Sequence, residues 1–170
     1  FEWEKTRCRI QTSEAGVGMV TLPSEPGGNR YSYGGAQAAI QVRDSDAVIV
    51  GFTITGGTGG YGLYDSDVGG GISYLVGTDL TVIDCIIEAN TAQHGGGIGS
   101  ELSAAADWVT ALDDRGTTIR NNTATRYGGG ISASGTAIFT DTVIEGNTAQ
   151  DGGGVAMYGN GYYVPASIDA

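Results

Sequence analysis

The chain has 170 residues, of which 31 are glycine, and its 19 acidic and 8 basic residues give a net charge of −11. This charge excludes nucleic acid as a partner, because phosphate backbones are bound by clustered Lys and Arg, and no apolar stretch is long enough to predict membrane insertion. With 40% hydrophobic residues the chain is too apolar to be disordered, so its glycines must serve an ordered, turn-rich fold.

The N-terminal segment repeats poorly, and we interpret residues 1–38 as a degenerate first coil or an N-terminal cap. Its best candidate strand is residues 6–13, where Cys8-Arg9-Ile10-Gln11 aligns with Phe52-Thr53-Ile54-Thr55. This alignment points Cys8 and Cys85 inward at least two coils apart, which is ~9.6 Å and exceeds the ~7 Å Cα limit of a disulfide. We therefore expect two free, buried thiols.

Internal repetition organises residues 39–170, which we interpret as one domain. A segment that runs from Asn90 through Thr91 and Ala92 to three glycines and an isoleucine has close copies that begin at Asn122 and Asn147. Glycine triplets begin at residues 69, 95, 128 and 152. Their intervals of 26, 33 and 24 residues define the repeat, and the longest interval contains an insertion near residues 100–113.

Short alternating segments flank each asparagine, and period-two alternation aligns their inward residues in columns. The first column contains Phe52, Cys85, Thr117 and Thr142. Two further columns contain Ile54, Ile87, Ile119 and Ile144, and Ile72, Ile98, Ile131 and Val155. A unit of two or three short strands cannot bury its apolar face alone, whereas stacked units can. The sequence therefore predicts an all-β fold, a right-handed parallel β-helix (a solenoid) of about five to six coils.

Residues 47–57, AVIVGFTITGG, and the three segments that join NTA to GGG resemble bacterial right-handed β-helix repeat proteins. The pattern is similar to that of polymorphic outer-membrane and autotransporter passenger domains, whose repeats carry GGA followed by an aliphatic residue and FxxN. It covers residues 47–158 and differs in having GGG for GGA. The resemblance implies the fold, export, and a secreted, extracellular or cell-surface location. It implies no activity, because this fold hosts many functions.

Polar columns follow from the same alignment. Asn90, Asn122 and Asn147 are predicted to form an axial ladder, since an amide both donates and accepts hydrogen bonds, and we interpret this ladder as structural. An outward column contains Thr55, Glu88, Arg120 and Glu145, in which Arg120 is expected to reach both glutamates. His94 aligns with Arg126 and Asp151, which predicts a variable surface position.

The insertion has apolar residues at helix-like spacing, and a helix and a loop with one strand stay open as alternatives. Insertions in solenoids lie on one face and often carry function, which makes Trp108 the contact candidate. Asp65 and Asp67 could offer carboxylates to calcium, although their loop lacks the further ligands of a calcium motif. We expect no other metal or cofactor.

Three functions compete. The favoured one is an extracellular structural or adhesive β-helix protein without enzymatic activity, as a filament subunit or a fragment of a longer surface protein, with glycans or a cell surface as targets. The second is a polysaccharide lyase or glycoside hydrolase, whose candidate catalytic residues are Asp84 and Asp141, in one column across Gly116. Their ~9.6 Å separation lies at the outer edge of the roughly 6.5–9.5 Å of an inverting pair. The third is ice binding by outward threonines, but Ile86 and Val143 interrupt their column.

The ends of a solenoid expose unpaired strand edges, which invite pairing unless they are covered. Both terminal segments contain aromatic and aliphatic residues, among them Phe1, Trp3, Tyr162 and Val164. We therefore expect end-to-end self-association of subunits, or continuation of the solenoid in a longer chain.

Overall fold

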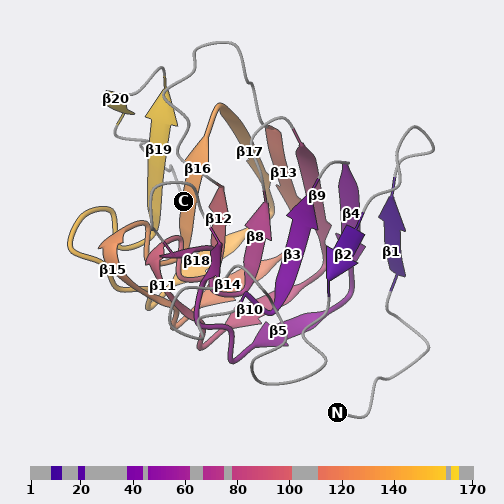
Figure 1. Ribbon diagram of the computed structural model, residues 1–170, viewed down its shortest axis with the longest axis horizontal. Helices are drawn as coiled ribbons and strands as arrows, with labels where there is room; N and C mark the ends of the chain where they lie inside the picture. The colour runs from indigo at the N-terminus through magenta and orange to yellow at the C-terminus, as the bar shows by residue number, and fades with distance from the viewer. Residues whose placement is uncertain are drawn as a thin grey trace.

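The computed structural model describes residues 9–12, 19–21, 38–43, 46–61, 67–74, 78–100, 111–159 and 162–164. These residues form strands and turns without a helix, and the chain winds repeatedly through the same four sheets (Figure 1). Strands of successive turns pair in parallel. The predicted parallel β-helix is thereby confirmed, with four strands in a full turn where the repeat suggested two or three.

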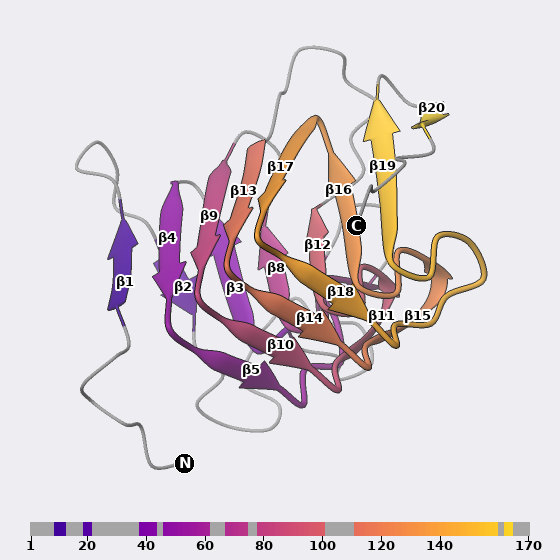
Figure 2. The same cartoon turned by 180° about the vertical axis from the view of Figure 1, so that it is seen from behind.

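We number the sheets in the order in which the chain visits them. The first contains β1 (Arg9–Thr12), β4 (Ala47–Val50), β9 (Asp79–Ile83), β13 (Ala111–Arg115) and β17 (Thr136–Thr140). The second contains β5 (Thr53–Thr55), β10 (Ile86–Glu88), β14 (Thr118–Arg120) and β18 (Val143–Glu145), which lie side by side in Figure 2. The third contains β6 (Gly60–Tyr61), β7 (Asp67–Val68), β11 (Thr91–His94) and β15 (Thr123–Tyr127).

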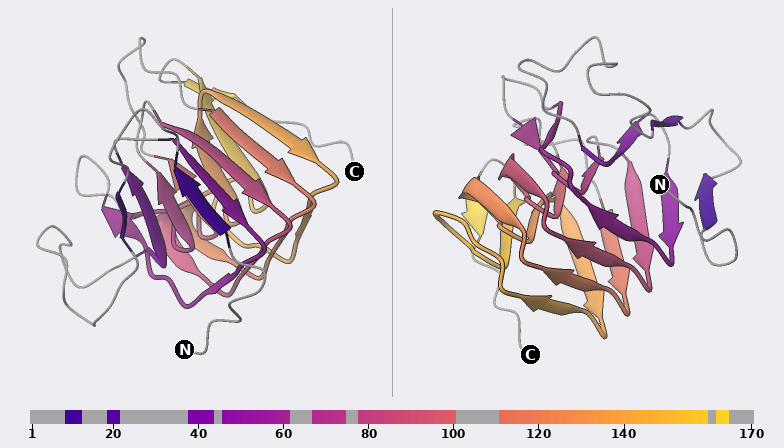
Figure 3. Two further views of the ribbon diagram at one scale, coloured as in Figure 1. Left: turned by 90° about the vertical axis from the view of Figure 1, so that its right-hand side faces the viewer. Right: turned by 90° about the horizontal axis from the view of Figure 1, so that it is seen from below.

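The fourth sheet contains β2 (Met19–Thr21), β3 (Ile40–Arg43), β8 (Ile72–Tyr74), β12 (Ile98–Ser100), β16 (Ile131–Ser134), β19 (Val155–Gly159) and β20 (Tyr162–Val164). In the described part of the chain, β3 precedes four successive turns, and the two views of Figure 3 show these turns stacked along one axis.

The aligned aliphatic residues form the core. The second sheet places one column directly in register: Ile54, Ile87, Ile119 and Ile144. The fourth sheet does the same for Ile72, Ile98, Ile131 and Val155. Ile87, Ile98 and Ile119 are fully buried, and burial of such a side chain contributes about 1.5–3 kcal/mol. Stacking of turns thus supplies the core that one turn lacks.

Three corners of each turn use the left-handed backbone region. At these corners φ is positive for Gly51, Asp84, Gly116 and Asp141 at the first, for Gly56, Ala89, Asn121 and Gly146 at the second, and for Gly69, Gly95, Gly128 and Gly152 at the third; Gly59 and Gly135 also have positive φ. A Cβ on Gly95 would overlap the carbonyl oxygen of Ile98. A Cβ on Gly97 would lie 2.6 Å from the carbonyl oxygen of Gly130 in the next turn. The glycine triplet is therefore required by the backbone and by the close approach of the turns.

Antiparallel strands cover part of each end of the solenoid. β1 pairs with β4 and β2 pairs with β3, which covers the N-terminal edges of the first and fourth sheets. At the other end β20 pairs with β19. β17 and β18 end the first and second sheets, and no described strand pairs with their outer edges. Phe139 and Ile144 continue core columns in this last turn but are only partly buried.

The N-terminal strand does not lie where its alignment suggested. Ile10 pairs with Ile49 in the first sheet in antiparallel register, whereas the similarity to residues 52–55 assigned it to the second sheet. The alignment was wrong because period-two alternation does not encode strand direction. Cys8 lies outside the described residues, and Cys85 is a free, buried thiol.

Candidate functional site

The three asparagines form a continuous ladder at the corner between the second and third sheets. Nδ2 of Asn90 donates to Oδ1 of Asn122 at 3.0 Å, and Nδ2 of Asn122 donates to Oδ1 of Asn147 at 3.0 Å. The same two oxygens accept the backbone N–H groups of Asn90 and Asn122. Asn90 and Asn122 are fully buried. Their amides therefore hold adjacent turns together and present nothing to a ligand.

A second ladder, which sequence reasoning missed, follows the corner between the first and second sheets. The backbone N–H of Phe52 donates to Sγ of Cys85 at 3.4 Å, and that of Cys85 donates to Oγ1 of Thr117 at 3.3 Å. The available signal was that Cys85, Thr117 and Thr142 follow Phe52 in a column predicted to point inward. Burial raises the pKa of the Cys85 thiol, which therefore stays protonated and is a poor nucleophile.

Asp84 and Asp141 share a corner column with Gly116 between them. The backbone N–H of Asp84 donates to the carbonyl of Arg115, and that of Gly116 donates to the carbonyl of Thr140, so each step is one turn. Two strand spacings, ~9.6 Å, separate the two aspartates. Both are exposed, and the residue between them is a glycine, so the column offers no third functional group.

The outward charge ladder is shorter than predicted. Nε of Arg120 donates to Glu88 at 2.8 Å. Glu145 lies beside Arg120 in register, but it makes no ion pair with any described residue. The expectation that Arg120 reaches both glutamates was wrong, because the single guanidinium is turned toward Glu88.

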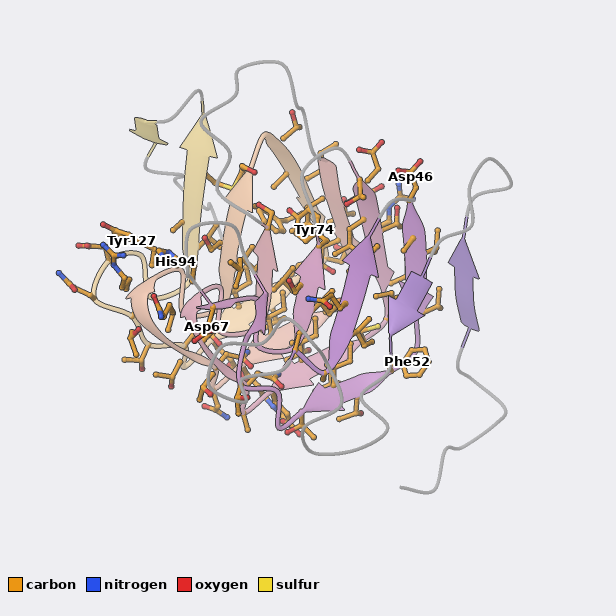
Figure 4. The ribbon with its side chains drawn as sticks, in the orientation of Figure 1. Asp46, Phe52, Asp67, Tyr74, His94 and Tyr127 are labelled. Carbon is orange, nitrogen blue, oxygen red and sulfur yellow. The ribbon has the colours of Figure 1, made fainter. Side chains whose placement is uncertain are left out.

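His94 lies in the interior, not at the surface as predicted. It is 2% exposed, and its ring stacks on that of Tyr127 with 5.2 Å between centroids. Figure 4 shows the two residues beside each other. The alignment failed by one residue, because a bulge in β15 pairs His94 with Tyr127 instead of Arg126. Burial, assisted by the Arg126 cation, lowers the pKa of His94 to about 4. The imidazole is neutral, and its Nδ1 hydrogen-bonds to no described group.

Asp114 is a buried acid that sequence reasoning did not find. It lies in register with Val82 and Phe139 and is fully buried. Burial raises the pKa of its carboxyl to about 6, against a smaller opposing effect of the Thr117 hydroxyl. Period-two continuation from Leu112 was the available signal. An acid with this pKa could donate a proton, but its enclosure keeps substrates away from it.

Of the remaining candidate site residues, the structure describes Asp67 but not Trp108 or Asp65. The contact and calcium hypotheses therefore stay predictions. The Asp67 carboxyl is partly buried, and burial raises its pKa against a hydrogen bond from Gln93. Within the described ranges, no three His, Cys, Asp or Glu side chains are grouped to hold a metal ion. The same residues contain no helix able to cross a membrane.

No family model matches the chain, and neither the curated proteins nor the solved structures include a match. The similarity to passenger domains therefore stays a prediction from the repeat motifs. The function must therefore be inferred from the aligned residues of successive turns and from the edges of the sheets.

Proposed function

We propose that the protein is an extracellular structural or adhesive β-helix protein without catalytic activity. The observation that carries this proposal is that two columns of buried polar residues serve structural hydrogen bonds. The Asn ladder and the Cys85–Thr117 ladder both bond turn to turn. The buried polar residues of these two ladders thus hold adjacent turns of the solenoid together.

The groups that a hydrolase or lyase would need do not converge in the described part of the chain. Asp84 and Asp141 are exposed and separated by a glycine. His94 is enclosed and neutral, and the Cys85 thiol is protonated. A net charge of −11 also repels acidic polysaccharides. Each of these observations favours a binding or structural role over glycan cleavage.

The outer surface of the third sheet offers a contact surface for an adhesive role. Thr91, Thr123 and Thr148 are exposed and lie directly in register on successive turns. A row of hydroxyls repeated every ~4.8 Å can donate to and accept from glycan hydroxyls without charge. Glycans or a cell surface are therefore the partners that we propose for this row.

The test combines binding and cleavage. We expect the protein to bind glycan-coated surfaces without releasing oligosaccharides, and the double variant Asp84→Asn and Asp141→Asn to behave like the wild type. Thr123→Lys should weaken binding, whereas the matched variant Thr140→Lys, exposed on the first sheet, should not. Glycan cleavage that the double Asn variant abolishes would overturn the proposal. Equal glycan binding by both Lys variants would show that the threonine row is not the binding surface.

A further inference from the structure

β17 ends the first sheet, no described strand pairs with its outer edge, and its sequence lacks the usual protection of an edge strand. Its five residues include no charged residue and no proline, and its outward Ile138 is 55% exposed. Natural edge strands normally carry a charge or a proline, or are covered. The chain covers three other edges with its own antiparallel strands β1, β2 and β20. β18, the neighbouring open edge, has only three residues and carries Glu145.

The hydrogen-bonding groups of β17 divide between its two sides. The carbonyl of Thr140 accepts the N–H of Gly116, so Thr140 directs its peptide groups toward β13. Alternate residues of a strand point their peptide groups the same way. Thr136 and Ile138 therefore also face β13, whereas Ala137 and Phe139 present N–H and C=O to the open edge.

This arrangement is self-complementary about Ile138. In an antiparallel pair of two β17 strands centred there, Ala137 of one copy lies opposite Phe139 of the second, and each pair exchanges two backbone hydrogen bonds. The two Ile138 residues meet as the close, non-hydrogen-bonded pair, in which side chains touch. A two-fold axis satisfies both copies at once and closes the assembly at a dimer.

Charge permits this contact in a protein that carries −11. Since β17 has no acid, its self-pairing brings no carboxylates together along the strand. The same register sets Asp141, just beyond β17, opposite Gly135 of the second copy. By contrast, a head-to-tail contact between first sheets would have to form on β1, which already occupies the edge of β4.

We propose that a second copy of this chain occupies the β17 edge, which joins two first sheets across a two-fold axis at Ile138. The pairing would also cover the partly buried Phe139. This inference rests on the self-association that the open ends suggest and is independent of the adhesive role.

Sedimentation over an about hundredfold range of concentration tests the proposal with the full chain. The wild type should approach twice 17.3 kDa, and Ile138→Lys should raise the dimer Kd at least about tenfold, because two ammonium groups meet at the axis. Thr81→Lys is the matched control, since Thr81 shares the outward column but lies on interior strand β9. Circular dichroism should show both variants folded. A monomeric wild type, an unaffected Ile138→Lys dimer, or growth beyond the dimer would overturn the proposal.

Disulfide trapping tests the register. Cysteines at residue 138 would lie ~4.5 Å apart between Cα atoms, within the range of a disulfide. Those at residue 140 would lie about 14 Å apart, because each is two residues from the axis. Ile138→Cys should therefore cross-link on mild oxidation, while Thr140→Cys should match the wild type. Equal cross-linking would exclude this register. A monomer that adheres to glycans would contradict this inference alone, and a dimer that cleaves them would contradict the proposed function alone.

Discussion

Replacement of Asn122 by leucine removes the centre of the Asn ladder and keeps a branched side chain with the same number of heavy atoms. The change leaves two buried donors without partners, the backbone N–H and one Nδ2 hydrogen of Asn90, and it removes the side-chain hydrogen bond that the carbonyl of Ile87 accepts. Each such donor costs about 1–3 kcal/mol. Allowing for local relaxation, the free energy of unfolding should fall by about 3–6 kcal/mol.

Urea denaturation followed by circular dichroism would measure this loss, with the m-value checked to show that the same transition is observed. For a chain of this size, the loss corresponds to a Tm lower by roughly 10–20 °C. Asn147→Leu is the internal control. Asn147 has equivalent hydrogen bonds, but it is only partly buried, so water can replace them and the loss should be smaller. A loss below about 1 kcal/mol for Asn122→Leu, or equal losses at both sites, would refute the ladder as the source of stability.

Three further predictions concern the core and the turns. Asp114→Asn should remove a pH dependence of stability, because the carboxyl has a pKa of about 6 in the folded protein and 3.8 in the unfolded chain. Wild-type stability should therefore fall as pH rises through about 6. Urea melts at several pH values should show the variant gaining up to ~3 kcal/mol relative to the wild type by pH 7. His94 has the opposite effect on the pH dependence of stability, because its pKa is about 4 in the folded protein and 6.5 in the unfolded chain. Wild-type stability should fall as pH decreases from 6.5 through 4. His94→Phe should remove up to ~3 kcal/mol of this loss of stability in acid. Gly97→Ala should cost about 1–3 kcal/mol by overpacking, whereas Gly154→Ala, whose Cβ would have its nearest atom at 3.5 Å, should be close to neutral in thermal melts.

Repetition explains which features the sequence predicted. Identical residues at one repeat position must superpose when turns stack, so the isoleucine columns and the asparagines could be aligned without coordinates. His94 was assigned wrongly because one bulged residue in β15 shifts the alignment, and no rule of alternation reveals a bulge. Asp114 was missed because residues 100–113 were treated as one insertion, although β13 begins at Ala111. The direction of β1 depends on pairing with a distant strand, which local pattern does not contain.

The left-handed corners also restrict how a solenoid of this kind can lengthen. Oδ1 of Asp84 leans over Gly116, where a Cβ would lie 2.5 Å from it, and Oδ1 of Asn121 leans over Gly146 at 2.7 Å. Glycine at the same corner of the following turn therefore leaves room for a long corner side chain, which a Cβ there would have to displace. Tandem duplication of one aspartate-bearing turn would place aspartate over aspartate, with overlap and like charges together. Duplication in pairs of turns keeps glycine and aspartate alternating at this corner, so recombination in the gene should favour steps of two turns over steps of one.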